Sequence, residues 1–272
     1  DSLDAAYTHY SGDLNIDSSL LLSRDDADLL RVAGGVNNEM FLASMIEQRF
    51  YDRQVTSVYD VMGYLSSKLA IRNYSIYEKN NPDFNGDMDT IIYLYQKNDW
   101  DLSLNDLKRF NGYSILLSST FWAFVDGWSR YVMTGIDHIQ YYEIFNFRLP
   151  DVNFYLNREG LSYHIQSGYR YNNIIQFPFA IEYIFYGVQT VEYTVGVKRL
   201  WFDHMSTETS VRVGHDIGMM QQISYQLNNY NRVNFGFELC QLNNLYGQRH
   251  IRSLKHSDHA WGFWLGWDVL LN

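Results

Sequence analysis

The stretch LSYHIQSGYRY, residues 161–171, points to the kind of fold that this sequence favours. One parity holds apolar and aromatic residues, which are Leu161, Tyr163, Ile165, Tyr169 and Tyr171. The other parity holds Ser162, His164, Gln166, Gly168 and Arg170. Side chains on a β-strand point alternately to its two faces, so a strand here would have one apolar face and one polar face.

The same alternation recurs along the chain. Further alternating segments span residues 55–72, 190–201, 211–218, 232–240 and 261–271. In each segment, apolar residues at every second position oppose small, polar or charged residues. Repeated segments of this kind, about ten residues long, indicate a sheet whose two faces meet different surroundings.

Composition narrows the class of protein. Hydrophobic residues make up 46% of the 272 residues, which excludes a disordered chain, and aromatics make up 17%. The formal net charge of −10 argues against nucleic acid as a partner. No window approaches the ~18 consecutive apolar residues of a membrane helix. The lone Cys240 excludes an intrachain disulfide framework, and no linker divides the chain, so we expect one domain over residues 1–272.

Two architectures share this alternation, a soluble β-sandwich and a membrane β-barrel. Three features favour the barrel. The polar parity is rich in small and amide residues, as a wet interior would be. Aromatic residues gather in 119–128, 139–147 and 201–204, which we place at strand ends, where Tyr and Trp favour the boundary between lipid and water. Mean hydropathy is only −0.30 despite the apolar strands.

The sequence therefore predicts an all-β fold, a closed antiparallel transmembrane β-barrel. Closure follows because an open sheet edge in hydrocarbon leaves backbone groups unpaired. Turn signals such as Asn111-Gly112 and Asp126-Gly127 suggest ~17 residues for each strand and turn, hence about 16 strands, with 12 to 18 allowed. Residues 1–50 are the uncertain part. We assign 24–53 to strands, with a short plug or periplasmic helix as the alternative.

The C-terminal hairpins carry a resemblance. Residues 223–253, followed by HAWGFWLGWDVLL at 259–271, have the layout of the last hairpins of bacterial outer-membrane barrels. Among these, the segment is most similar to the barrel domains of TPR-linked exopolysaccharide export porins. The resemblance implies residence in the outer membrane of a Gram-negative bacterium. It also implies lipid, lipopolysaccharide, a hydrophilic solute or polysaccharide and periplasmic export machinery as partners. Asn272 departs from the usual terminal Phe or Trp.

Signals for enzyme chemistry are weaker than their structural alternatives. His164 and Ser167 lie three apart, so on a strand they would face opposite sides and could not act as a pair. Residues 249–259 contain three histidines and an aspartate, but without the spacing of a metal site. We interpret them as a solvated loop and Cys240 as structural. No enzyme activity, metal or cofactor is expected.

Parity on the expected strands assigns a set of polar side chains to the lumen. Mixed charges there would either set selectivity or simply hold the wall together, and lumen tyrosines could stack on sugar rings. The lumen-lining candidates are Asp60, Tyr64, Lys68, Arg72, His164, Gln166, Arg170, Glu192, Lys198, Arg212, Asp216, Glu238 and Asp268.

These expectations combine into a functional prediction. The protein is predicted to be an outer-membrane channel that passes a hydrophilic solute, most concretely an exopolysaccharide. A general diffusion porin is the alternative within the same class. Two other classes remain open at this point: an outer-membrane lipid-modifying enzyme, and a plugged structural or receptor barrel that anchors a periplasmic machine.

Overall fold

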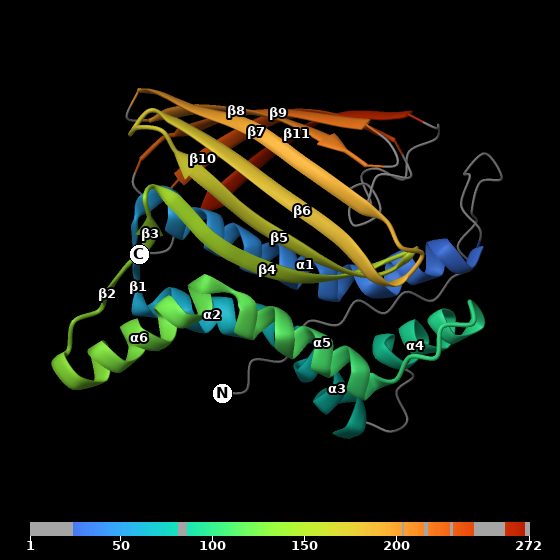
Figure 1. Ribbon diagram of the computed structural model, residues 1–272. Helices are drawn as coiled ribbons and strands as arrows, with labels where there is room; N and C mark the ends of the chain where they lie inside the picture. The colour runs from blue at the N-terminus through green and yellow to red at the C-terminus, as the bar shows by residue number, and fades with distance from the viewer. Residues whose placement is uncertain are drawn as a thin grey trace.

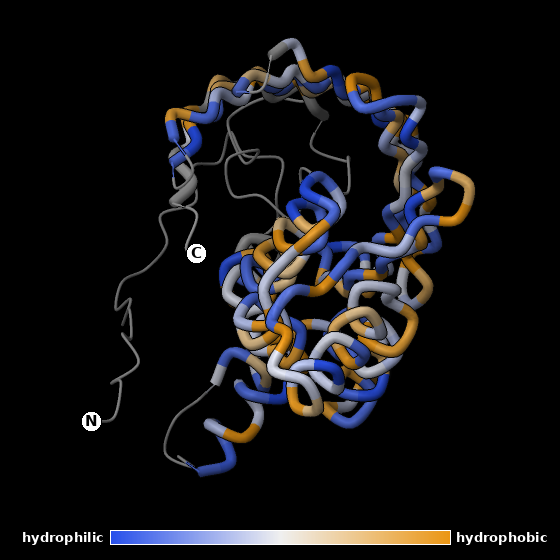
Figure 2. Tube along the Cα trace, turned by 90° about the vertical axis from the view of Figure 1, so that its left-hand side faces the viewer, coloured by the Kyte–Doolittle hydropathy of each residue, from blue (hydrophilic) through white to orange (hydrophobic). Residues whose placement is uncertain are grey.

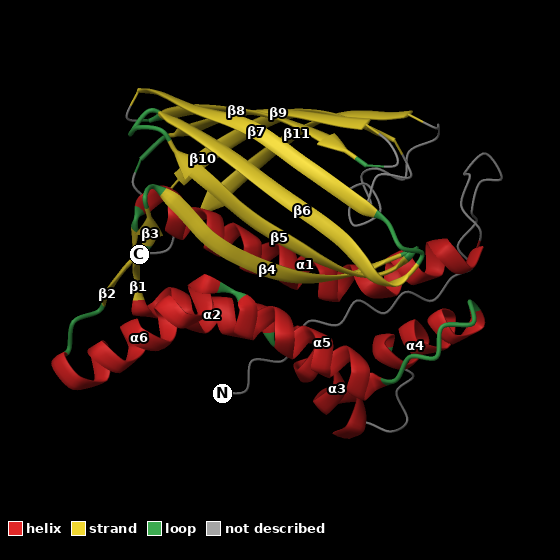
Figure 3. Ribbon diagram, viewed as in Figure 1, coloured by secondary structure: helices red, strands yellow, loops and turns green. Residues whose placement is uncertain are grey.

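A computed structural model describes residues 24–80, 86–202, 204–214, 217–228, 231–241 and 259–269. The first half of the described chain is helical and the second half forms a sheet (Figures 1 and 3). The helices are α1 (Arg24–Arg53), α2 (Val58–Lys68), α3 (Ala70–Asn80), α4 (Asp87–Lys97), α5 (Leu104–Leu117) and α6 (Ser119–Thr134).

The strands form two antiparallel sheets. A small one pairs β1 (Val55–Ser57) with β2 (His138–Gln140). The larger one is a meander with the order β11-β10-β9-β8-β7-β6-β5-β4-β3. Its strands are β3 (Glu143–Ile144), β4 (Phe147–Asn157), β5 (Gly160–Arg170), β6 (Ile175–Gly187), β7 (Val191–Phe202), β8 (Met205–Val213), β9 (Ile217–Gln226), β10 (Asn231–Gln241) and β11 (His259–Val269).

The larger sheet is bent into an arch, and the helices lie on its inner side and beside β4 (Figure 2). The segment 161–171 forms β5, as the sequence predicts, between β4 and β6. The hairpin from β4 to β5 turns at Gly160, whose φ of +135° suits glycine. A Cβ at this position would lie 2.0 Å from the Tyr186 carbonyl oxygen, so a side chain cannot be accommodated.

Local signals explain where the helices begin and end. Ser103 and Asp106 form a capping box at the start of α5, and Ser57 caps α2 through the Tyr59 amide. Helix α6 ends at Gly135, which adopts a left-handed φ of +73°. The sequence therefore encodes these helices locally.

Two apolar clusters fix the helices in place. The first joins α1, α3, α4 and α5 to β4 and β5, with Phe154 and Leu161 among its buried residues. The second joins α1, α2 and α6, with Phe50, Tyr64 and Phe124 in edge-on or tilted aromatic contact. The end of the sheet nearest the helices is thus buried in protein.

The prediction of an all-β closed barrel is wrong. Residues 24–134 are mostly helical, the described strands number eleven, and the larger sheet is open, with β3 and β4 at one side and β11 at the other. The alternation over 55–72 is compatible with a strand and with a helix, because a spacing of four keeps one strand parity and also one helix face. Asp60, Tyr64 and Lys68 therefore share a face of α2.

Three other assignments are also wrong. Residues 24–53 form α1, so the strand assignment is wrong and the helical alternative holds for this stretch. The aromatic segment 119–128 lies inside α6 rather than at a strand end. The expected turns at Asn111-Gly112 and Asp126-Gly127 lie inside α5 and α6.

The outer edge of β4 explains why this side of the sheet stays open. The Asn37 side chain of α1 donates a hydrogen bond to the Leu156 carbonyl at 2.9 Å and accepts one from the Leu156 amide at 3.0 Å. It therefore makes the two backbone hydrogen bonds that a neighbouring strand would make. Ser118 accepts the Val152 amide at 2.9 Å, and Lys68 donates to the Val152 carbonyl at 2.6 Å. Backbone groups that would pair with another strand are therefore already satisfied by helix side chains.

This edge coverage makes a stability prediction. Asn37→Leu leaves the buried Leu156 amide and carbonyl without partners, which should lower the free energy of unfolding by about 2–4 kcal/mol. Asn105→Leu, on the exposed surface of α5, is the control and should change it by less than about 0.5 kcal/mol. Urea unfolding in mild detergent measures both. Equal effects of the two substitutions would contradict the coverage of β4.

Candidate functional site

The outer side of the arch is exposed and apolar. It carries side chains of one parity from β6 to β11, and Val195 at its middle is 59% exposed. We call this surface the convex apolar face. Its exposed residues are Phe177, Phe179, Ile181, Tyr183, Tyr193, Val195, Val197, Trp201, Val211, Val213, Ile217, Ile223, Tyr225, Phe235, Leu239, Phe263 and Leu265.

Strand register makes these side chains a continuous surface. Val195 pairs with Phe179 on one side and Val211 on the other, and Phe235 pairs with Ile223 and Leu265. Cross-strand partners on one face lie about 4.5–5.5 Å apart, so the apolar side chains touch their neighbours.

The convex apolar face has little polarity. On β6 to β10, Arg199 is the one charged residue among the described side chains of this parity, and its guanidinium lies 3.9 Å from the Trp201 ring centre. Tyr183 and Tyr193 lie toward one end of the strands, and Trp201 and Tyr225 toward the other. Aliphatic residues and Phe make up most of the surface between these aromatic ends, with Thr209 of β8 and Gln221 of β9 among them.

The inner side of the arch is polar and largely paired. Lys198 on β7 lies 2.6 Å from Asp52 of α1. Arg170 on β5 pairs with Glu143 at 3.1 Å and donates to the Tyr51 carbonyl at 2.8 Å. Helix α1 therefore runs under the sheet and bonds to β5 and β7 through its last turns (Figure 1).

A fully buried ion pair lies between α1 and α2. The Glu47 carboxylate is 2.9 Å from the Lys68 ammonium, and both side chains are 0% exposed. Gln166 and Asn153 donate to Glu47 at 2.6 and 2.8 Å, and the Tyr64 hydroxyl donates to it at 3.1 Å. We call these five residues the Glu47 cluster. It joins two helices to β4 and β5.

Burial decides the protonation chemistry of this cluster. Burial raises the pKa of the Glu47 carboxyl, and the Lys68 ammonium opposes that rise. Burial and the nearby Glu47 carboxylate raise the pKa of Tyr64 well above its ordinary value. Since neither Glu47 nor Lys68 contacts solvent, the cluster has the properties of a structural ion pair rather than of a catalytic acid and base.

A second buried pair lies at the start of α6. Arg148 and Asp151 of β4 are 3.0 Å apart, and Asp151 accepts the Thr120 amide at 2.8 Å. A carboxylate at a helix N-terminus is favoured by the helix dipole. Burial works against the charged form of Arg148, but its interactions with Asp151, Tyr141 and Glu47 together outweigh burial and raise the pKa of Arg148.

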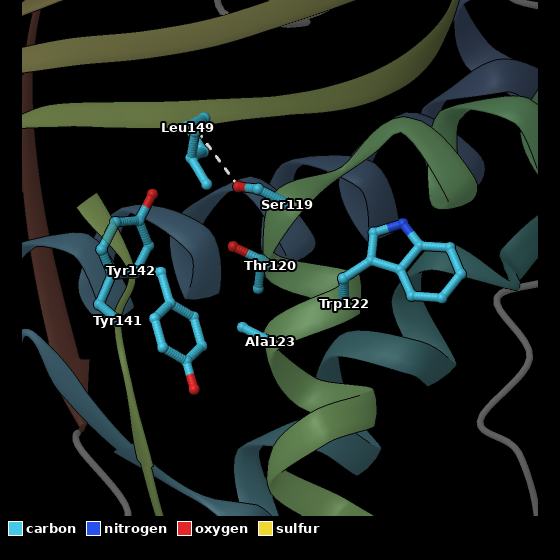
Figure 4. Close-up of a pocket in the computed structure, with 7 residues that line it drawn as sticks. All are labelled: Ser119, Thr120, Trp122, Ala123, Tyr141, Tyr142 and Leu149. Atoms are coloured by element: carbon cyan, nitrogen blue, oxygen red, sulfur yellow. Dashed lines mark hydrogen bonds between the residues drawn. The ribbon is translucent and has the colours of Figure 1, made fainter. Parts of the chain in front are cut away.

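A pocket opens next to this pair. Its volume is about 350 Å³, and its walls come from α6 and from the segment around β3 (Figure 4). The Ser119 hydroxyl is turned to the Leu149 carbonyl, at 3.2 Å, and the Thr120 hydroxyl to Asp151, at 3.1 Å. The lining residues are Ser119, Thr120, Trp122, Ala123, Tyr141, Tyr142 and Leu149.

The structure distributes the lumen candidates over several places. Asp60 pairs with Arg49 on the helical side, and Arg72 is exposed on α3. Tyr64, Lys68 and Gln166 meet in the Glu47 cluster.

The remaining candidates belong to the sheet. His164 packs edge-on against Tyr155, with ring centres 6.1 Å apart. Glu192 is buried on β7, and Arg212 pairs with Glu238 at 3.3 Å between β8 and β10. Asp216 lies outside the described residues, and Asp268 is described only through the backbone of β11.

The sequence analysis missed the helical partners of these residues. Glu47 and Asp52 lie in the stretch that was assigned to strands, and neither was a candidate. The available signal was the spacing of Met40, Ala43 and Phe50, which are buried on one face of α1. A helix with that face toward the core places Glu47 beside them.

Ser167 donates its hydroxyl to the Arg148 carbonyl at 2.6 Å. Within the described ranges, no three of the His, Cys, Asp and Glu side chains come together as metal ligands. His250, His256 and Asp258 lie outside those ranges.

Comparison with known proteins gives no family. No family model, curated protein or solved structure matches this chain. Of the helices described, none combines the length and the hydropathy needed to cross a membrane. The resemblance to outer-membrane barrels therefore stays a prediction, and function is argued from geometry.

The Glu47 cluster makes the second stability prediction. Lys68→Met leaves a buried carboxylate without its counter-ion, which should lower the free energy of unfolding by about 3–5 kcal/mol. The double substitution Glu47→Gln with Lys68→Met should recover part of that loss, because no unpaired charge remains. Lys97→Met breaks the exposed pair with Asp25 and should leave stability close to wild type. A double variant less stable than Lys68→Met would contradict the assignment.

Proposed function

We propose that this protein is a membrane-embedded anchor of the Gram-negative outer membrane. The convex apolar face contacts lipid hydrocarbon, and the helical half of the chain is bonded to the inner side of the arch at β4, β5 and β7. The observation on which this proposal depends is the exposed, mainly apolar surface from β6 to β11, in which Arg199, Thr207, Thr209 and Gln221 are polar interruptions. Soluble monomers rarely expose an apolar patch larger than about 300–600 Å².

The arrangement of residue types favours lipid over a protein partner. Protein interfaces combine apolar contacts with about ten hydrogen bonds, and the middle of this face has few groups that could form them. Tyr and Trp lie at both ends of the strands, as in proteins whose strands meet the lipid–water boundary. Along β7, Tyr193 to Trp201 is a run of nine residues, about 27 Å along the strand at ~3.4 Å per residue, and a tilted membrane strand needs about 9–11 residues.

The inner side supports an anchor rather than an open path. Lys198, Arg170 and Gln166 each bond to α1. A solute that passed along β5 to β7 would have to displace α1 and leave Lys198 and Arg170 without these partners. The proposed role is therefore structural or receptor-like, with the helical half available to bind periplasmic machinery.

Export through a channel is a second candidate, favoured by one observation. The inner side of β8 to β10 carries Arg212 with Glu238 and Gln222 with Asn234, away from α1. Planar-bilayer recording separates the two candidates. An anchor should leave the bilayer at baseline current, whereas a stable conductance from the purified chain would favour the channel.

If the convex apolar face contacts lipid, an arginine should lower the free energy of unfolding at an exposed valine of that face and not at an exposed valine elsewhere. Val195→Arg places a charge in the convex apolar face and should cost about 2–4 kcal/mol in lipid vesicles. Val55→Arg is the matched control, since Val55 is 43% exposed on β1, outside that face. It should change stability by less than about 0.5 kcal/mol. Vesicle flotation and unfolding in vesicles measure both.

One result would contradict the proposed lipid contact. If Val195→Arg floats with vesicles and unfolds like Val55→Arg, the convex apolar face is in water or against protein, and the proposal is wrong.

A further inference from the structure

A second apolar surface lies on the helical half of the chain. It follows the outward side of α5 and α6 over residues 113–136, and we call it the α5–α6 face. Its exposed apolar residues are Tyr113, Leu116, Leu117, Trp122, Val125, Trp128, Val132, Met133 and Ile136.

Charge is nearly absent from the α5–α6 face. Asp126 is the one exposed acidic residue between 113 and 136, and it pairs with Arg130 at 2.8 Å and accepts the Tyr142 hydroxyl at 3.0 Å. Upstream, the first turns of α5 carry Asp106, Lys108 and Arg109. The surface therefore changes from charged to apolar along the helix pair.

The fold holds this face outward. The inward side of α6 consists of Thr120, Ala123, Phe124 and Gly127, which are all buried. A Cβ on Gly127 would lie 2.4 Å from the side chain of Ile139, so α6 contacts β2 too closely to rotate. The tryptophans of α6 cannot turn inward without breaking that contact.

The helix pair also adjoins the covered edge of the sheet. At the junction of α5 and α6, Ser118 bonds to Val152 and Ser119 to the Leu149 carbonyl. On α5, the Phe110 ring lies 4.9 Å from Phe185 of β6 and the Phe110 carbonyl accepts the Tyr163 hydroxyl. The α5–α6 pair thus lies against the β4 side of the sheet and contacts β4, β5 and β6 (Figure 1).

We propose that the α5–α6 face contacts the same lipid layer as the convex apolar face, so that helices extend the lipid-facing wall beyond β4. This inference rests on the proposed function. Helices can replace strands there because their backbone groups bond internally. Lipid is the occupant because the surface offers hydrocarbon and few free polar groups.

The hydrogen bond of Trp122 and its position beside the pocket are consistent with lipid at the α5–α6 face. Its indole N–H donates to the Leu116 carbonyl at 2.8 Å, so the exposed ring presents carbon to its surroundings. It also borders the pocket of about 350 Å³ beside Ala123 and Tyr142, into which an acyl chain can extend (Figure 4).

Fluorescence quenching by brominated lipids tests the proposal. Three single-tryptophan variants of the full chain retain Trp122, Trp201 or Trp100, with Phe at the other tryptophan positions, and each is reconstituted in vesicles with or without brominated acyl chains. Trp122 on α6 should lose as much fluorescence as Trp201 on the convex apolar face. Trp100, partly buried against Tyr95, should lose little.

The outcomes separate the two proposals. Quenching of Trp201 without quenching of Trp122 overturns this inference and leaves the proposed function standing. Absence of quenching at both in vesicle-bound protein overturns both, and quenching of Trp122 alone overturns the shared lipid layer. If a multiple variant does not fold, Trp122→Phe and Trp100→Phe in the native chain suffice. The first should lower the quenchable share of fluorescence and the second should raise it.

Discussion

The covered edge of β4 is the constraint on which the rest of this structure depends. A strand edge that is buried must satisfy its amides and carbonyls, and here Asn37, Ser118 and Lys68 do so. Those side chains come from three different helical positions, so the helical half is fixed to the sheet through hydrogen bonds as well as apolar packing. Because the edge is occupied, β4 cannot pair with β11, and the sheet remains an open arch.

The two faces of the open arch differ in what they contact. On the inner side, ion pairs such as Lys198 with Asp52 hold α1 under the strands. On the outer side, the apolar side chains of β6 to β11 have no described protein layer over them, and the Tyr and Trp residues gather at the strand ends. The hydrophobic effect makes such a surface unfavourable in water, and lipid contact removes the cost. The outward side of α5 and α6 shows the same chemistry beside the covered edge.

The sequence predicted several strands of the larger sheet, but not the helices and buried side chains that contact it. Alternation identified β5, β7, β10 and β11, because strands between two unlike surroundings repeat every two residues. The expectation of one strand over 211–218 was wrong, since this segment holds the end of β8 and the start of β9. It failed over 55–72, where residues spaced by four satisfy strand and helix patterns alike. The coverage of β4 could not be foreseen, since Asn37 and Leu156 lie 119 residues apart. Glu47 was missed because its buried partners Lys68, Asn153 and Gln166 become neighbours only in the fold.

Spin-label accessibility along β7 tests the central claim most directly. Cysteines are placed one at a time at positions 193 to 198, after Cys240→Ser, and labelled in vesicle-bound protein. The account predicts that labels at Tyr193, Val195 and Val197 collide often with oxygen and rarely with a water-soluble nickel chelate. Labels at Thr194, Gly196 and Lys198 should collide little with oxygen. Frequent collision of the odd-numbered labels with the nickel chelate would contradict the lipid contact and the function proposed from it.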